Sequence, residues 1–328
     1  MSRKPTRREF LKSVVGAGVC AGLGAPLLAS GRSLAASAST RSRAEEVALA
    51  ARRAAGRPEE LASLPPLPYR QDDPLWGKDP MWDRQRVIQT HVKGNRRPRA
   101  EAEALMREFE DGNTIGNEGC MLTCLAMVLR LLDPAQADAR WTPRSLNRVA
   151  HELNYYTLAG LSMAPLFADL VCEVSAGEVQ LCAKEEYLSG EPGWPRTHVH
   201  DSALVRAYRG LAPRRRRDFV VMLKTGTYDD TVASHYVLLQ PDSSESPDGP
   251  DPELLDPAMP LEASLPWRLS DSARRICEDP DIRKAWKEGG IEPNQIGGAW
   301  VFARWRSSQD RMIMGPLIGA WAAELARP

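Results

Sequence analysis

The chain has 328 residues, enough for one large domain or two small ones, and 43% of them are hydrophobic, which is enough for a substantial core. Its 43 Lys and Arg residues balance its 43 Asp and Glu residues, but residues 1–38 hold six basic residues and one acidic residue. The rest of the chain therefore carries 37 basic and 42 acidic residues. A mildly acidic body of this kind gives no reason to expect nucleic-acid binding.

The first 38 residues have the composition of an export signal. Paired arginines in "TRREFLK" (6–12) precede a weakly apolar run rich in Gly and Ala, and small residues follow at Ala36 and Ala38. This order resembles the bacterial twin-arginine signal. The resemblance implies transport of a folded protein by the twin-arginine export machinery, cleavage near Ala38 and a periplasmic or secreted location. The alternative is a membrane-anchoring helix, but the run is short and Gly-rich for a stable span, and we expect no membrane span in the mature chain.

Residues 39–68 are expected to form a linker with a loose helix, because an Ala- and Glu-rich stretch is ended by "SLPPLP" (63–68). We expect one folded domain over residues 69–328. It would carry insertions near 77–111 and 155–215, and the first of these contains a predicted exposed helix, "RAEAEALMREFE" (99–110).

The stretch "GNEGCMLTCLAMVLRLL" (116–132) is the most apolar part of the mature chain and predicts a buried helix that begins near Cys120. At that position the sulfur would lie beside free backbone N–H groups and the positive end of the helix dipole, which favours a reactive thiolate. Gly119 would allow a substrate to approach the backbone. From this segment alone, Cys120 is either a nucleophile or a small core residue, and Cys124 is expected in the core.

Clear helix and strand signals follow the apolar helix. In "WTPRSLNRVAHELN" (141–154), Thr142 is a predicted N-cap, Pro143 occupies the first helical position and the apolar residues recur at helical spacing. Short apolar, β-branched runs predict strands, and "PLIGAWAAELA" (316–326) predicts a helix. Because helices precede strands, we expect an α+β domain. The predicted strands cover 218–224, 234–240 and 299–305.

Five cysteines remain after the signal, an odd number that predicts at least one free thiol. Cys172 and Cys182 lie in "VCEVSAGEVQLC", two apolar runs around a Gly turn. They could form a cross-hairpin disulfide or remain two reduced core cysteines, and the pattern does not choose between these alternatives. The pairing of Cys124 and Cys277 is equally open.

A cysteine nucleophile needs a base and a group that orients the base. His235 opens an apolar strand, so its backbone is anchored while its side chain could face a cleft. Asp256 ends the apolar run "ELLDP", which could pair beside that strand and bring the carboxylate to the imidazole. "HVH" (198–200) places two imidazoles on one face, but no Cys or carboxylate pattern lies nearby, so we expect no metal site. The weaker candidates are His91 and His151 as bases, and Asp242, Asp248 and Asp251 as orienting acids.

Five segments in a fixed order carry a resemblance over about residues 69–260. They are "QDDPLWG" (71–77), "GCMLTCLAMVL" (119–129), "TPRSLN" (142–147), "SHYVLL" (234–239) and "LLDP" (254–257). With these segments the chain is similar to papain-fold cysteine peptidases of the bacteriocin leader-processing type, and more so to their extracellular and phage-borne relatives. The resemblance implies a papain-like α+β fold in which the nucleophile helix packs on an antiparallel sheet. It also implies Cys120 as nucleophile, His235 as base and Asp256 as orienting acid.

The same resemblance implies a side-chain amide that, with a backbone N–H, stabilises the oxyanion. Gln71 is the amide in the matching motif, although a long insertion separates it from the cysteine helix. Asn113 and Asn117 are nearer alternatives, and Asn117 could equally cap the cysteine helix.

The implied activity is that of an exported cysteine hydrolase that cleaves peptide or amide bonds in a peptide or protein substrate, through an acyl-enzyme intermediate and without a metal or organic cofactor. Two alternatives stay open. The same groups would perform transglutaminase-like acyl transfer if the acceptor were an amine, and the fold could serve as a non-catalytic binding module.

Overall fold

The protein is described from a computed structural model, which covers most of the chain between Pro65 and Arg304. The predicted signal at 1–38, the predicted C-terminal helix and most of the linker lie outside the described residues. Of the predicted helix 99–110, Ala100 and Glu103 are helical and the remainder is also outside. The described residues are 65–81, 114–132, 141–153, 155–157, 160–161, 166–186, 197–225, 235–241 and 249–304, together with Glu45, Ala100 and Glu103.

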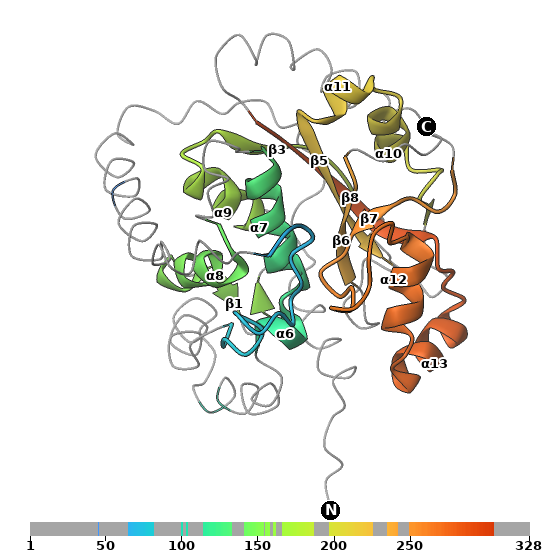
Figure 1. Ribbon diagram of the computed structural model, residues 1–328, viewed down its shortest axis with the longest axis horizontal. Helices are drawn as coiled ribbons and strands as arrows, with labels where there is room; N and C mark the ends of the chain where they lie inside the picture. The colour runs from blue at the N-terminus through green and yellow to red at the C-terminus, as the bar shows by residue number, and fades with distance from the viewer. Residues whose placement is uncertain are drawn as a thin grey trace, which may run out of the picture.

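In the described part of the chain, the main sheet has six strands and is antiparallel throughout (Figure 1). Its order is β3-β8-β5-β6-β7, with β4 paired to one end of β8, and β1 and β2 form a separate pair. The three predicted strands are confirmed as β5, β6 and β8. The bounds are β1 (Tyr156–Thr157), β2 (Gly160–Leu161), β3 (Val179–Glu186), β4 (Thr197–His198), β5 (Phe219–Thr225), β6 (His235–Leu239), β7 (Leu254–Leu255) and β8 (Gln295–Arg304).

Helices cover both faces of this sheet, and the combination of helices with an antiparallel sheet confirms the α+β class. The helix expected after Thr142 is α8, and it has the predicted cap: Thr142 Oγ1 accepts from Ser145 N, and Pro143 opens the helix. The bounds are α6 (Ile115–Glu118), α7 (Cys120–Leu132), α8 (Pro143–Glu152), α9 (Leu166–Val174), α10 (Ala203–Arg209), α11 (Pro213–Arg216), α12 (Leu269–Ile276) and α13 (Pro280–Gly289).

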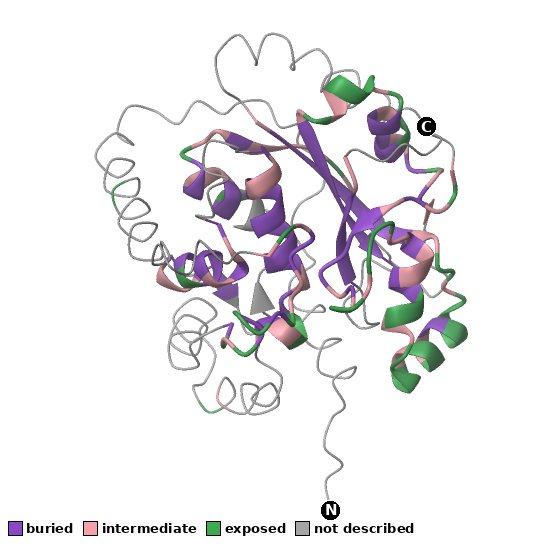
Figure 2. Ribbon diagram, viewed as in Figure 1, coloured by how far each residue is buried: buried purple, intermediate pink, exposed green. Residues whose placement is uncertain are grey.

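The two faces of the sheet belong to two separate cores, because successive side chains of a strand point to opposite sides. On β5, Val220 and Met222 pack with α7, α8 and α9, whereas Val221 and Leu223 pack with α10 and the start of α12. All seven residues of β5 are buried, and Figure 2 shows the central strands buried along their length. This double burial explains why the strands are continuous apolar runs instead of alternating ones.

The segment that carries Cys172 and Cys182 differs from the expected hairpin. Cys172 lies in α9 and Cys182 in β3, joined by a turn in which Ala176 and Gly177 have φ of 53° and 83°. None of the five described cysteines, Cys172 and Cys182 included, forms a disulfide. Of the two alternatives left open, the cross-hairpin disulfide is wrong and the two reduced cysteines are what the structure has. A short apolar run does not by itself distinguish a buried helix from a strand, and the run around Cys172 is a helix.

Two regions contribute more to the fold than the sequence suggested. The stretch 155–215, expected as an insertion, supplies β3 and β4 to the main sheet. Helices α12 and α13 lie between β7 and β8, so helices are not confined to the first half. Packing also reaches back to Pro65, whose carbonyl accepts from Arg130 Nη1.

Within the described residues, no helix combines the length and apolar character needed to cross a bilayer.

Candidate active site

Cys120 is the first residue of α7, as the sequence predicted. The first helical hydrogen bond runs from Thr123 N to Gly119 O at 2.8 Å, so the N–H groups of residues 120–122 precede it. Helix geometry leaves such groups without an acceptor inside the helix. Leu122 and Leu125 are fully buried against the sheet, and Cys124 is fully buried too, as expected. The buried body of α7 therefore sets the helix axis, and half-buried Cys120 stands at its positive end.

The turn that leads into α7 explains Gly119. Helix α6 ends there, and Gly119 N donates to Ile115 O at 2.8 Å. A Cβ on Gly119 would lie 2.4 Å from that same carbonyl oxygen. Ile115, and not a substrate, thus occupies the space beside the glycine. The glycine is required because two helices follow each other with no intervening loop.

Asn117 does not cap the cysteine helix, a role that the sequence allowed. It lies inside α6, where its backbone N donates to the Thr114 side chain, and Thr114 is the cap of that helix. Asn117 is exposed and does not cap α7. Its prediction as a cap of the cysteine helix was wrong because a separate four-residue helix, α6, precedes α7. Asn113 lies outside the described residues.

His235 and Asp256 are brought together by the pairing of β6 with β7, which was predicted. The register places Leu238 opposite Leu255 and Leu239 opposite Leu254. His235 opens β6, Asp256 follows β7, and His235 Nε2 lies 2.6 Å from Asp256 Oδ1. Both side chains are buried. The ion pair is therefore shielded from water and held by the sheet.

Two further donors hold the Asp256 carboxylate. Ala258 N donates to Oδ1 at 2.7 Å, and Trp267 Nε1 donates to Oδ2 at 2.9 Å. Burial by itself raises the pKa of Asp256, but the nearby His235 charge and the hydrogen bonds from His235 and Ala258 hold it below its usual value of 3.8. The carboxylate is thus ionised at neutral pH. Sequence reasoning missed Trp267: an indole N–H needs an acceptor when partly buried, but with nine tryptophans in the chain nothing local pointed to this one.

The surroundings of His235 favour the positively charged form of its imidazole. Burial lowers the pKa of His235, but the Asp256 charge and hydrogen bond, followed by the hydrogen bond and charge of Cys120, raise it from 6.5 to about 10. Because Nε2 is engaged by Asp256, Nδ1 is the ring nitrogen left for the Cys120 thiol. The interactions therefore run from Cys120 to His235 and from His235 to Asp256, so that the imidazole can hold or transfer a proton.

Gln71 is returned to this region despite its distance in the sequence. Its Nε2 donates to Gly116 O at 2.7 Å, and its backbone N donates to Pro257 O at 2.8 Å. Gln71 thereby joins, through its side chain and its backbone, the segment that leads into Cys120 to the segment that follows Asp256. Gln71 is 45 residues from Gly116 in sequence.

A close approach of two glycines makes that return possible. Gly116 N donates to Gly77 O at 2.9 Å, and a Cβ on Gly116 would lie 2.8 Å from the same oxygen. The loop 71–77 therefore rests directly on α6, the short helix that precedes α7.

The remaining candidates lie in other contacts. Asp251 accepts from Ser270 N and Oγ at the start of α12, at 2.9 and 2.7 Å. The His151 ring packs on Tyr156. The His198 and His200 rings stack on each other, and His198 Nε2 lies 3.0 Å from Glu292 Oε2. Among the described residues, no group of three or more His, Cys, Asp or Glu side chains is arranged to hold a metal ion. His91, Asp242 and Asp248 lie outside the described residues.

Comparisons with protein-family models, with curated proteins and with solved structures found no match to this chain. The sequence motifs and the geometry around Cys120 are therefore the observations that bear on function.

Proposed function

We propose that this protein is a cysteine hydrolase with a papain-like fold, which cleaves peptide or amide bonds through Cys120, His235 and Asp256. One observation supports this most: a buried histidine lies 2.6 Å from a buried carboxylate and also interacts with a cysteine at the first position of a buried helix. A structural cysteine in the core needs neither the helix end nor the charged histidine.

The reaction follows from these positions. Held beside the His235 imidazolium, the Cys120 thiolate attacks the carbonyl carbon of the substrate, and the electron pair of the C=O bond moves to the oxygen. The N–H groups that open α7 stabilise this oxyanion, with Gln71 Nε2 as the side-chain donor. His235 then gives its proton to the leaving amine as the C–N bond breaks, and an acyl-thioester with Cys120 remains.

Water completes the cycle. His235, now neutral, takes a proton from the water molecule that attacks the thioester, and the C–S bond breaks to release the acid and restore the thiolate–imidazolium pair. Asp256 keeps the imidazole oriented and stabilises its charge throughout, and Trp267 and Ala258 keep the Asp256 carboxylate in place.

The site of action is proposed from the sequence. The twin-arginine pattern of residues 6–12 and the small residues at Ala36 and Ala38 support export to the periplasm or beyond. The fold described above would then act on substrates of the cell envelope or the surroundings.

Thiol labelling tests the proposal. The mature protein would be treated with iodoacetamide across pH 5 to 8, and each cysteine followed by mass spectrometry. We expect one fast site, Cys120, that is absent in Cys120→Ala and slowed in His235→Ala. Half-buried Cys172 and Cys182 serve as references within the same molecule. Equal, slow labelling of all five cysteines would contradict the proposal and favour a binding module.

A further inference from the structure

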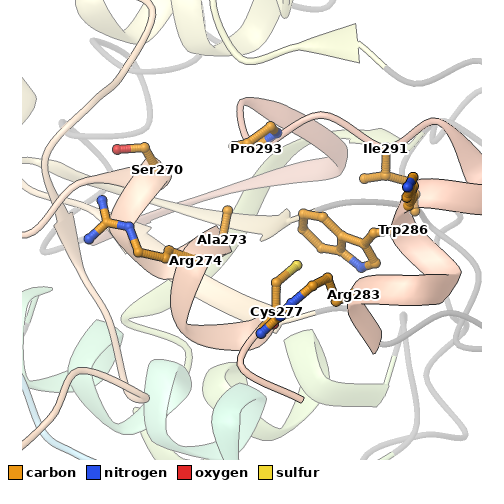
Figure 3. A pocket seen from close by; sticks show the side chains of 9 residues that line it. Ser270, Ala273, Arg274, Cys277, Arg283, Trp286, Ile291 and Pro293 are labelled. Atoms are coloured by element: carbon orange, nitrogen blue, oxygen red, sulfur yellow. The ribbon is translucent and has the colours of Figure 1, made fainter. Parts of the chain in front are cut away.

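Helices α12 and α13 enclose a pocket away from Cys120 (Figure 3). Its volume is about 480 Å³, within the range of sites that enclose small ligands or large side chains. Trp286 lies in the middle of the lining, between Ala273 and Cys277 of the α12 segment and Ile291 beyond α13. The interior is therefore apolar and suits an apolar side chain.

The rim of this pocket is positively charged. Three cations line it, Arg274, Arg283 and Lys287, and no acidic residue does. Arg274 is paired with Asp271. The Arg283 guanidinium donates from Nε to the backbone carbonyl oxygen of Cys277 at 2.7 Å, and no carboxylate in the described part of the chain pairs with it. Within the described residues, no acidic side chain pairs with Lys287.

The pocket is connected to the candidate active site through α12. Trp267, which donates to Asp256, lies two residues before this helix, and Ser270 and Ala273 of the helix line the pocket. An eight-residue helix is about 12 Å long. An extended peptide rises about 3.3 Å per residue, so a chain bound at the active site would span this length with about four residues.

We propose that this pocket binds an acidic peptide segment, with one large apolar side chain inserted beside Trp286 and its carboxylates on Arg283 and Lys287. The charge complementarity of the rim carries the choice of an acidic occupant. Resting on the proposed function, this segment belongs to the substrate and lies at least about four residues from the bond that is cleaved. The pocket then selects substrates without taking part in the reaction.

Binding is measured without catalysis. The probe is a fluorescein-labelled acidic octapeptide with one tryptophan, titrated with the mature Cys120→Ala protein and followed by fluorescence anisotropy. Two control peptides replace the acidic residues by lysine, or the tryptophan by alanine. We expect the tryptophan-to-alanine peptide to bind about tenfold more weakly, because a buried apolar side chain is lost, and the lysine peptide not to bind.

A pair of variants on α13 locates the site. Lys287→Gln removes a rim charge and should weaken binding up to about fivefold, the range of one exposed ion pair. Lys284→Gln makes the same change on the same helix but outside the lining and should leave binding unchanged. The bound peptide should also protect Cys277 from iodoacetamide, with Cys182 as the unprotected reference.

Three results would overturn the proposal. They are failure of the acidic peptide to bind, equal weakening by the two lysine variants, and labelling of Cys277 that the peptide does not slow. Because the test uses Cys120→Ala, it can fail while Cys120 labelling of the wild type still supports the hydrolase. Peptide binding with no reactive Cys120 would instead leave a binding module.

Discussion

Replacing Asp256 by Asn should remove most of the charge on His235 while preserving the shape of the site. Asn keeps an acceptor for the imidazole, but it carries no negative charge. Burial, which lowers the pKa of His235, would then be opposed chiefly by Cys120. We therefore expect the pKa of His235 to fall from about 10 to 6.5 or below.

The size of the effect follows from the two pKa values. The difference between 6.5 and about 10 corresponds to roughly 5 kcal/mol in favour of the imidazolium. With a pKa of 6.5, about a quarter of the histidine would be charged at pH 7, compared with nearly all of it in the wild type. Without the imidazolium, the Cys120 thiolate loses its partner, and labelling near pH 6 to 7 should slow by about tenfold or more.

The assay is the rate of iodoacetamide labelling of Cys120 between pH 5 and 10. The wild-type rate should remain high at the acid end, whereas the Asp256→Asn rate should rise steeply with pH and approach the wild-type rate above about pH 9, where free thiols ionise. Asp251→Asn is the matched control, because Asp251 also accepts two hydrogen bonds but from Ser270, away from His235. Superimposable pH profiles for Asp256→Asn and wild type would refute the thiolate–imidazolium pair.

Three further expectations concern stability. Gly119→Ala should lower the free energy of unfolding by about 1–3 kcal/mol, because the added Cβ clashes with backbone atoms. Gly289→Ala on α13 is the control: its Cβ meets only ordinary contacts, so the change should be neutral or slightly stabilising. Urea denaturation measures both variants. Trp267→Phe should cost about 1.5–3 kcal/mol, because the buried carboxylate loses a donor; an unchanged urea midpoint would contradict this. Because the pKa of His235 is raised on folding, its charged form stabilises the fold fully below pH 6.5, and this stabilisation is lost as the pH rises toward about 10. Because the pKa of Asp256 is lowered on folding, its charged form stabilises the fold above pH 3.8, and this stabilisation is lost at lower pH. The temperature of thermal unfolding should therefore be highest near pH 4 to 6.5, and this optimum should flatten in Asp256→Asn.

Local signals predicted the elements that depend on neighbours in the chain. The cap at Thr142 and the proline after it mark the start of α8, and the apolar run after Cys120 marks α7. Helix α13 has comparable marks, with Asp279 as N-cap and Gly290 in the left-handed conformation, which could have been found in the same way. Caps and periodicity act within one or two turns, so they can be read without the fold.

Contacts between distant segments could not be predicted in this way. Cys172 lies in helix α9 and not in a strand of a hairpin. The apolar residues around it are buried because α9 packs on β3, and not because they pair with a neighbouring strand across the turn. The donation of Trp267 to Asp256 depends on a loop whose course no local pattern specifies.

The sequence by itself determined the candidates: a cysteine at the start of an apolar helix, a histidine at the start of an apolar strand and an aspartate at the end of another. Their chemistry and their places at element ends are local properties. Only the tertiary structure decided that they meet, because the pairing of β6 with β7 brings Asp256 to His235, and the packing of α7 on β6 brings Cys120 into interaction with the same histidine. It also decided the place of Gln71, because only the folded chain closes the 45 residues between it and Gly116.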